Sequence, residues 1–256
     1  MKKIIFVFSA ILLTTLLAST AQAFHSWGLY HWARKANPLS LKLGDNLTST
    51  SWKAHLATAS ADWSASSVLD TTVVAGLGGK NCKANLGRAE VCNRKYGNNG
   101  WLGLAQIWIS SNHITQGLVK MNDTYFSLPK YNNPNEKLHV VCQEVGHIFG
   151  LDHQSEDGSS QNTCMDYFSN TGANASSTLS THPNTHDYEQ LETIYAHLDA
   201  TNTSSSTAGS ANAAVDLEDP KAWGKLIRES ADKKTSVFER DLGKGNKIFT
   251  FVTWAE

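Results

Sequence analysis

The feature that most constrains this 256-residue chain is the segment QEVGHIFGLDH, which begins at Gln143. Residues four apart on a helix share one face and lie about 6 Å apart along its axis. Gln143 and His147 can therefore reach the same ion, with Glu144 beside it. Gly150 then permits a sharp turn, because glycine has no Cβ. After that turn, His153 can return to the same ion as a third ligand.

Such an arrangement predicts a hydrolytic zinc site. Three protein ligands leave one position of a tetrahedral Zn2+ ion open for water. The metal lowers the pKa of that water, and a neighbouring carboxylate can then take its proton. We therefore expect Gln143, His147 and His153 as the metal ligands and Glu144 as the general base.

The segment resembles the motif of the metzincin superfamily of zinc proteases. That motif is His-Glu-x-x-His-x-x-Gly-x-x-His, followed by a turn containing methionine. The matching positions are Glu144, His147, Gly150 and His153. A later segment, CMDY from Cys164, is similar to the Met-x-Tyr turn of astacin-like and serralysin-like members.

The resemblance covers about residues 39–199 and implies both a fold and an activity. The fold would be α+β, with a mixed twisted sheet, an active-site helix, the methionine turn and a C-terminal helix. Met165 would lie in the turn beneath the metal site. Tyr167 would act at the metal or the transition state. The activity would be endopeptidase cleavage of protein or peptide substrates by a zinc-bound water.

One ligand position departs from the family motif, because Gln143 stands where histidine is expected. A glutamine offers a neutral amide oxygen, a poorer zinc ligand than imidazole. Three interpretations stay open. Gln143 ligates weakly, with Tyr167 helping; zinc is held by His147, His153 and another group; or catalysis is lost. His139 shares the helix face but lies about 12 Å from His147 along the axis, too far to replace the ligand.

The chain begins with the pattern of an export signal. Lys2 and Lys3 precede an apolar run over residues 4–17, and Ala21-Gln22-Ala23 fits a signal peptidase site. An uncleaved membrane anchor is disfavoured, because the run is shorter than the roughly 20 residues that span a bilayer. We expect a secreted protein with no stable membrane anchor after cleavage.

Four cysteines remain after cleavage: Cys82, Cys92, Cys142 and Cys164. An even number in an exported chain predicts two disulfides, and the residues alone leave three pairings open. A cysteine metal site is disfavoured, because no C-x-x-C spacing occurs. The metzincin resemblance favours Cys142–Cys164, which would tie the active-site helix to the methionine turn, and hence Cys82–Cys92.

Hydrophobic periodicity indicates the order of elements. Strands are expected at residues 39–43, 68–75, 101–109 and 247–254, and helices at 52–63, 135–149 and 185–198. The Gly- and Asn-rich residues 82–100 are interpreted as a disulfide-stapled loop, and 114–126 are left unassigned.

The predicted units are a signal peptide (1–23), a metzincin-like catalytic domain (24–200), a linker (201–217) and a small β-rich C-terminal appendage (218–256). The linker is predicted from its Ser-, Thr-, Ala- and Asn-rich composition.

Charge and composition narrow the function. Charged residues make up 18% of the chain and the net charge is -1, which argues against nucleic acid as a partner. We expect a monomer that acts on protein or peptide substrates with Zn2+. Two alternatives stay open: a catalytically inactive metzincin-fold binding protein, and a zinc hydrolase acting on a non-protein substrate such as a cell-wall peptide or ester.

Overall fold

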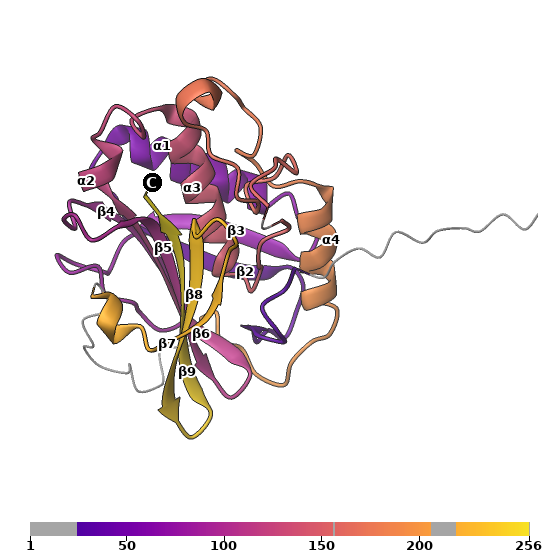
Figure 1. Cartoon of the computed structure of the whole chain (residues 1–256). Helices are drawn as coiled ribbons and strands as arrows, with labels where there is room; N and C mark the ends of the chain where they lie inside the picture. The colour runs from indigo at the N-terminus through magenta and orange to yellow at the C-terminus, as the bar shows by residue number, and fades with distance from the viewer. Residues whose placement is uncertain (1–24, 156, 206–218, 256) are drawn as a thin grey trace, which may run out of the picture.

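The computed structural model describes residues 25–155, 157–205 and 219–255 (Figure 1). The predicted signal peptide and most of the predicted linker lie outside the described residues. Within them the chain has the expected α+β class: a twisted mixed sheet of nine strands and a few helices. None of the described helices has the length and hydrophobicity of a membrane-spanning segment.

The sheet has a mainly parallel half and an antiparallel half. Its strands are β1 (His31–Trp32), β2 (Leu39–Asn46), β3 (Leu69–Ala75), β4 (Ala89–Arg94), β5 (Trp101–Ser110), β6 (His113–Asn122), β7 (Lys225–Glu229), β8 (Thr235–Gly243) and β9 (Asn246–Trp254). Their order is β3-β2-β4-β6-β5-β9-β8-β7, with β1 beside β6. Pairings among β1, β2, β3, β4 and β6 are parallel. Those that join β6, β5, β9, β8 and β7 are antiparallel.

Helices occupy the connections between strands. They are α1 (Thr50–Trp63), α2 (Asp123–Phe126), α3 (Pro134–His147) and α4 (Thr185–Ile194), with two 3-10 turns, η1 (Gly172–Asn174) and η2 (Pro220–Ala222). The predicted apolar face of α1 is confirmed, since Trp52, Leu56, Ala59 and Trp63 are all buried. The predicted α3 is confirmed too: Asn133 caps it, Pro134 starts it, and it ends at His147.

Glycines let α3 pack closely between the sheet and the segment after it. A Cβ added at Gly103 of β5 would lie 2.5 Å from Cγ1 of Val140. A Cβ at Gly146 within α3 would lie 2.4 Å from Sδ of Met165. Real Cβ contacts are longer than this, so neither position accepts a larger residue without movement. Met165 therefore lies directly against the backbone of α3.

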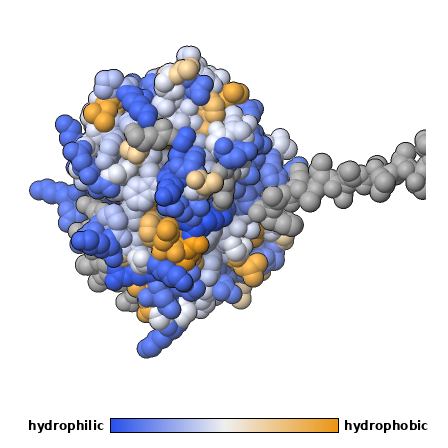
Figure 2. Space-filling model, viewed as in Figure 1, coloured by the Kyte–Doolittle hydropathy of each residue, from blue (hydrophilic) through white to orange (hydrophobic). Residues whose placement is uncertain are grey.

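The C-terminal residues correct one expectation. Strands β7, β8 and β9 form in the region predicted to be a small separate appendage, but they extend the main sheet, because β9 pairs with β5 along its length. Phe249 and Phe251 of β9 are buried in the main core. The physical reason is that the outer edge of β5 would otherwise be unpaired. Figure 2 shows apolar side chains gathered over β7 and β8, and Leu226 and Ile227 of β7 are exposed.

Two further segments differ from the sequence expectation. The predicted loop 82–100 contains β4, which lies between β2 and β6 and is almost entirely buried. The unassigned residues 114–126 form most of β6 and all of α2. The disulfides are Cys82–Cys92 and Cys142–Cys164, the pairs expected from the sequence and the resemblance.

Replacing Gly150 should destabilise the fold more than replacing a glycine with similar backbone strain but free space. Gly150 has φ +95°, and an added Cβ would lie 2.4 Å from the carbonyl oxygen of Tyr30. Gly97 has φ +90° and nothing within 4 Å. Both alanine variants carry the positive-φ penalty, about 1–2 kcal/mol. Gly150→Ala should cost about 1–3 kcal/mol more because of the clash. Urea unfolding measures the difference; equal losses for both variants would contradict this account.

Candidate metal centre

The two motif histidines converge after the turn at Gly150. Nε2 of His147, at the end of α3, lies 3.1 Å from Nε2 of His153. Two nitrogens bound to one tetrahedral zinc ion at 2.0–2.1 Å would be separated by about 3.3 Å. Both side chains are buried. The pair therefore has the spacing that a shared metal ion requires.

Hydrogen bonding fixes the tautomer of His147. Its Nδ1 donates to the carbonyl oxygen of Leu151 at 2.9 Å. In a neutral imidazole this leaves a lone pair on Nε2, the atom that faces His153. Burial lowers the pKa of His147 to about 3, with a further lowering from His153, so the imidazole is neutral at pH 7. A neutral imidazole with a free Nε2 lone pair is the form that binds a metal.

An ion pair supports His153 from the other side. Its backbone N donates to Oδ1 of Asp152 at 2.8 Å, and Nδ1 lies 3.5 Å from the same oxygen. Arg228 of β7 also donates to Asp152. Burial alone would raise the pKa of Asp152, but the hydrogen bonds and charges of His153 and Arg228 outweigh it and hold the pKa well below its usual range. Asp152 is therefore a fixed negative charge beside the centre.

Glu144 lies on α3 next to this pair and is 0% exposed. Its Oε1 accepts a hydrogen bond from Oγ1 of Thr253 at 2.9 Å. Its Oε2 is buried and makes no hydrogen bond with any described residue. Burial raises the pKa of the carboxyl to about 8, against the opposing effect of the Thr253 hydrogen bond. A buried carboxyl with an orphaned oxygen fits a site completed by a cation, which would favour the charged form.

The amide of Gln143 is held at both ends. Its Nε2 donates to the carbonyl oxygen of Asp166 at 2.7 Å, and its Oε1 lies 3.0 Å from Oγ1 of Thr253, whose single hydroxyl proton is shared between Gln143 and Glu144. One lone pair of Oε1 remains available. Across the described residues, no third His, Cys, Asp or Glu joins His147 and His153 with ligand atoms within 4.8 Å of one another. Two imidazoles thus fit a zinc ion, while a third protein ligand stays a proposal.

The segment Cys164–Tyr167, which the resemblance predicts to be a methionine turn and which we call the methionine-turn segment, packs against α3 and His153. Met165 lies under Gly146, and its carbonyl oxygen accepts from the backbone N of Gln154 at 2.6 Å. The ring of Tyr167 lies against that of His153, with centroids 4.3 Å apart. The Cys142–Cys164 disulfide ties this segment to α3 one residue before Gln143. The turn thereby supports both the end of α3 and the returning histidine.

Sequence reasoning missed the contribution of β9. The ring of Phe251 stacks on His147, with centroids 4.4 Å apart and an interplanar angle of 8°. Thr253 bonds both Gln143 and Glu144. No local motif marks either residue, because β9 lies about a hundred positions along the chain from α3. His139, which shares the helix face with Gln143 and His147, is buried, and its Nδ1 lies 3.1 Å from Oδ1 of Asn170.

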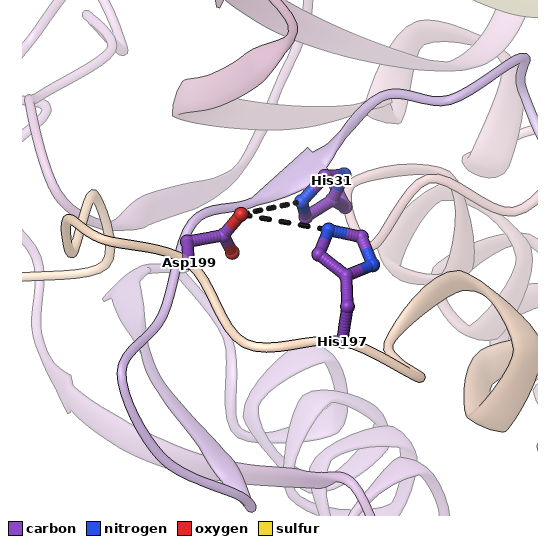
Figure 3. Close-up of side chains that lie close together, drawn as sticks. All are labelled: His31, His197 and Asp199. Atoms are coloured by element: carbon purple, nitrogen blue, oxygen red, sulfur yellow. Dashed lines mark hydrogen bonds and ion pairs between the residues drawn. The ribbon is translucent and has the colours of Figure 1, made fainter.

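A second group of metal-type side chains lies elsewhere. Ligand atoms of His31, His197 and Asp199 all lie within 4.8 Å of one another, and this is the only group of three or more His, Cys, Asp or Glu of that kind in the part of the chain that is described (Figure 3). The sequence motif gave no indication of it.

Comparison with known proteins adds little. No family model matches the chain, and no curated protein matches it. Among solved structures it is similar to one titled "Structure of myroilysin", with a TM-score of 0.37 and 13% identity, over 64% of this chain and 96% of that chain. A likeness this weak carries no argument about fold or activity.

Removing the Thr253 hydroxyl should destabilise the protein. Thr253→Val keeps the β-branched shape but leaves acceptors on Gln143 and Glu144 unsatisfied in a buried place, at a cost of about 1–3 kcal/mol. Thr72→Val, at an exposed position of β3, is the matched control and should change stability by less than about 0.5 kcal/mol. Urea unfolding of both variants checks this; equal stability would mean that the two hydrogen bonds contribute nothing.

Proposed function

We propose that this chain is a secreted zinc-dependent endopeptidase of the metzincin type that its motif resembles. The observation that carries the proposal is the 3.1 Å approach of Nε2 of His147 to Nε2 of His153, beside the buried carboxyl of Glu144. Secretion is supported by the N-terminal signal pattern and by the two disulfides, which are typical of exported proteins.

His147 and His153 would hold the ion, and the carboxamide oxygen of Gln143 is the third ligand we assign. When bound there, zinc would supply Lewis acidity toward the scissile carbonyl and toward water. Glu144 takes the proton of the attacking water and returns it to the leaving amine. Tyr167, which packs on His153, is assigned a hydrogen bond to the developing oxyanion.

The alternative is a catalytically inactive relative that uses the fold for binding. One observation favours it: the Gln143 amide already has hydrogen-bond partners at both ends. In that case the zinc affinity conferred by His147 and His153 would be weak, since two protein ligands are fewer than catalytic zinc sites use. Metal content and cleavage therefore separate the two proposals.

Replacing the general base should abolish cleavage without removing the metal. Glu144→Gln should lower kcat/KM on an unstructured protein substrate by about 10²–10⁴-fold, since the side chain can no longer take a proton. Glu189→Gln, at an exposed position on α4, should leave kcat/KM unchanged. Zinc content by elemental analysis should match the wild type in both variants. Cleavage that survives in Glu144→Gln would refute the mechanism.

Wild-type protein that binds zinc but cleaves nothing would favour the inactive alternative. Gln143→His tests the third ligand in the same experiments. If the glutamine oxygen is a ligand, imidazole in its place should tighten zinc binding by more than about tenfold. Unchanged affinity would remove position 143 from the ligand set.

A further inference from the structure

Three imidazoles surround one carboxylate oxygen at the end of the sheet away from the motif. Oδ1 of Asp199 lies 3.4 Å from Nε2 of His31, 3.3 Å from Nε2 of His113 and 3.5 Å from Nε2 of His197. Figure 3 shows His31 and His197 turned toward the same oxygen. The His31 and His197 rings meet edge to face, with centroids 4.8 Å apart.

Hydrogen bonds to the backbone orient both His31 and Asp199. Nδ1 of His31 donates to the carbonyl oxygen of Leu29 at 2.8 Å, which turns Nε2 of the ring toward Asp199. Oδ2 of Asp199 accepts from the backbone N of Arg34 at 3.0 Å, which leaves Oδ1 to the imidazoles. The ring nitrogens and this carboxylate oxygen therefore face one another across distances that a bound cation can bridge.

The spacing suits a cation. Oxygen and nitrogen ligands at 2.0–2.2 Å from a tetrahedral zinc ion are separated by about 3.4 Å. The distances from Oδ1 of Asp199 to His31 and His197 match that edge. His113 lies as close to the oxygen but outside the group whose atoms are mutually within 4.8 Å.

We propose that His31, His197 and Asp199 form a second metal site, distinct from the motif site, which takes Zn2+ or a similar imidazole-preferring divalent cation. Such an ion would join β1 to the segment that follows α4 in the chain. The two parts are already in contact, because the backbone N of Asp199 donates to the carbonyl oxygen of Arg34 at 2.8 Å. The site would therefore be structural.

Zinc stoichiometry of the full chain tests this site. His197→Ala removes a ligand whose side chain is 59% exposed, so the fold should persist. His182→Ala is the matched control, since that side chain is 52% exposed and also pairs with an aspartate, Asp62. After dialysis against buffered zinc, His197→Ala should hold one zinc fewer than wild type, with binding weakened by more than about tenfold. His182→Ala should match wild type.

The two zinc sites are separable. His153→Ala reports the motif site, and His197→Ala reports this one. If the motif site binds no zinc, wild type should hold one ion and His197→Ala none. Equal zinc content in wild type and His197→Ala would overturn the second site and leave the proposed function untouched.

A different observation carries a second inference, which rests on the proposed function. Strand β9 covers the candidate metal centre of His147, His153 and Glu144. The ring of Phe251 stacks on His147, and the hydroxyl of Thr253 donates a hydrogen bond to Glu144. Thr253 stands opposite Gly103 of β5, the strand packed on α3. An extended peptide binds a sheet through the unpaired backbone groups of an edge strand. Without β9, the edge beside the centre would be β5.

We infer that β9 occupies the position of an extended peptide substrate and lowers the activity of the wild type, which cleaves only during the fraction of time that β9 is displaced. The centre is inaccessible as it stands: His147 is 1% exposed and Glu144 is 0% exposed. A scissile peptide bond cannot reach them while the Phe251 ring and the Thr253 hydroxyl are in place. Displacement of β9 would free both the backbone edge of β5 and the side chains of the centre.

A reversible lock tests this inhibition. Gln106 and Thr250 stand opposite each other on β5 and β9, so cysteines at both positions can form a disulfide that holds β9 down. Cysteines replacing Asp241 and Lys247, which stand opposite each other on β8 and β9, are the control. A disulfide between them joins β9 to β8 and leaves β9 free to separate from β5. Oxidised Gln106→Cys/Thr250→Cys should lose more than about tenfold of its peptidase activity and regain it on mild reduction.

Zinc removal gives a readout that does not depend on activity. In the His197→Ala background, a coloured chelator should take zinc from the oxidised lock at least tenfold more slowly than from the control pair. Equal cleavage and equal zinc removal in lock and control would overturn the inhibition by β9. That result would leave the proposed function standing, because its own test is the loss of cleavage in Glu144→Gln.

Discussion

The burial of α3 is the constraint on which the rest of the structure depends. Every residue from His139 to His147 is buried, so the helix has no solvent face over its last turns. It lies between the sheet, which approaches at Gly103, and the methionine-turn segment, which approaches at Gly146. A helix enclosed in this way must satisfy its polar side chains within the protein. Gln143, Glu144 and His147 are therefore positioned by the elements around them.

Each of those polar groups is satisfied by a different part of the chain. His147 donates a hydrogen bond to the carbonyl oxygen of Leu151, beyond the turn. Gln143 donates one to the carbonyl oxygen of Asp166, in the methionine-turn segment. Glu144 accepts one from Thr253 of β9. Of the side chains of Gln143, Glu144 and His147, Glu144 has one oxygen, Oε2, that is buried and makes no hydrogen bond with a described residue. Burial of this carboxyl away from water raises its pKa to about 8 and lowers the stability of the fold. Groups with such shifted pKa values are typical of functional sites. That shift is why we place the chemistry here.

What the sequence could predict is what local signals specify. Pro134 and Gly150 bracket α3, and periodicity marks the buried face of α1, so both helices and the histidine turn are foreseeable. Strand β4 was missed because Gly- and Asn-rich residues flank it within 82–100 and the buried Glu90 interrupts its apolar pattern. Alternation in residues 247–254 predicts a strand but not its partner. The Thr253 contacts and the His31–Asp199 pair join residues more than a hundred positions apart, and no local pattern encodes them.

The N-terminal segment connects the two candidate centres. The backbone N of Trp27 donates to the carbonyl oxygen of Gly150 at 2.8 Å, so the segment lies on the turn that returns His153. A few residues later, Nε1 of Trp32 donates to the carbonyl oxygen of Ile148 at 2.8 Å, and the adjacent His31 faces Asp199. An ion held by His31 would restrain the same segment that restrains the histidine turn. The second site would then stabilise the geometry of the first without contacting it, by limiting the motion of one short stretch of chain.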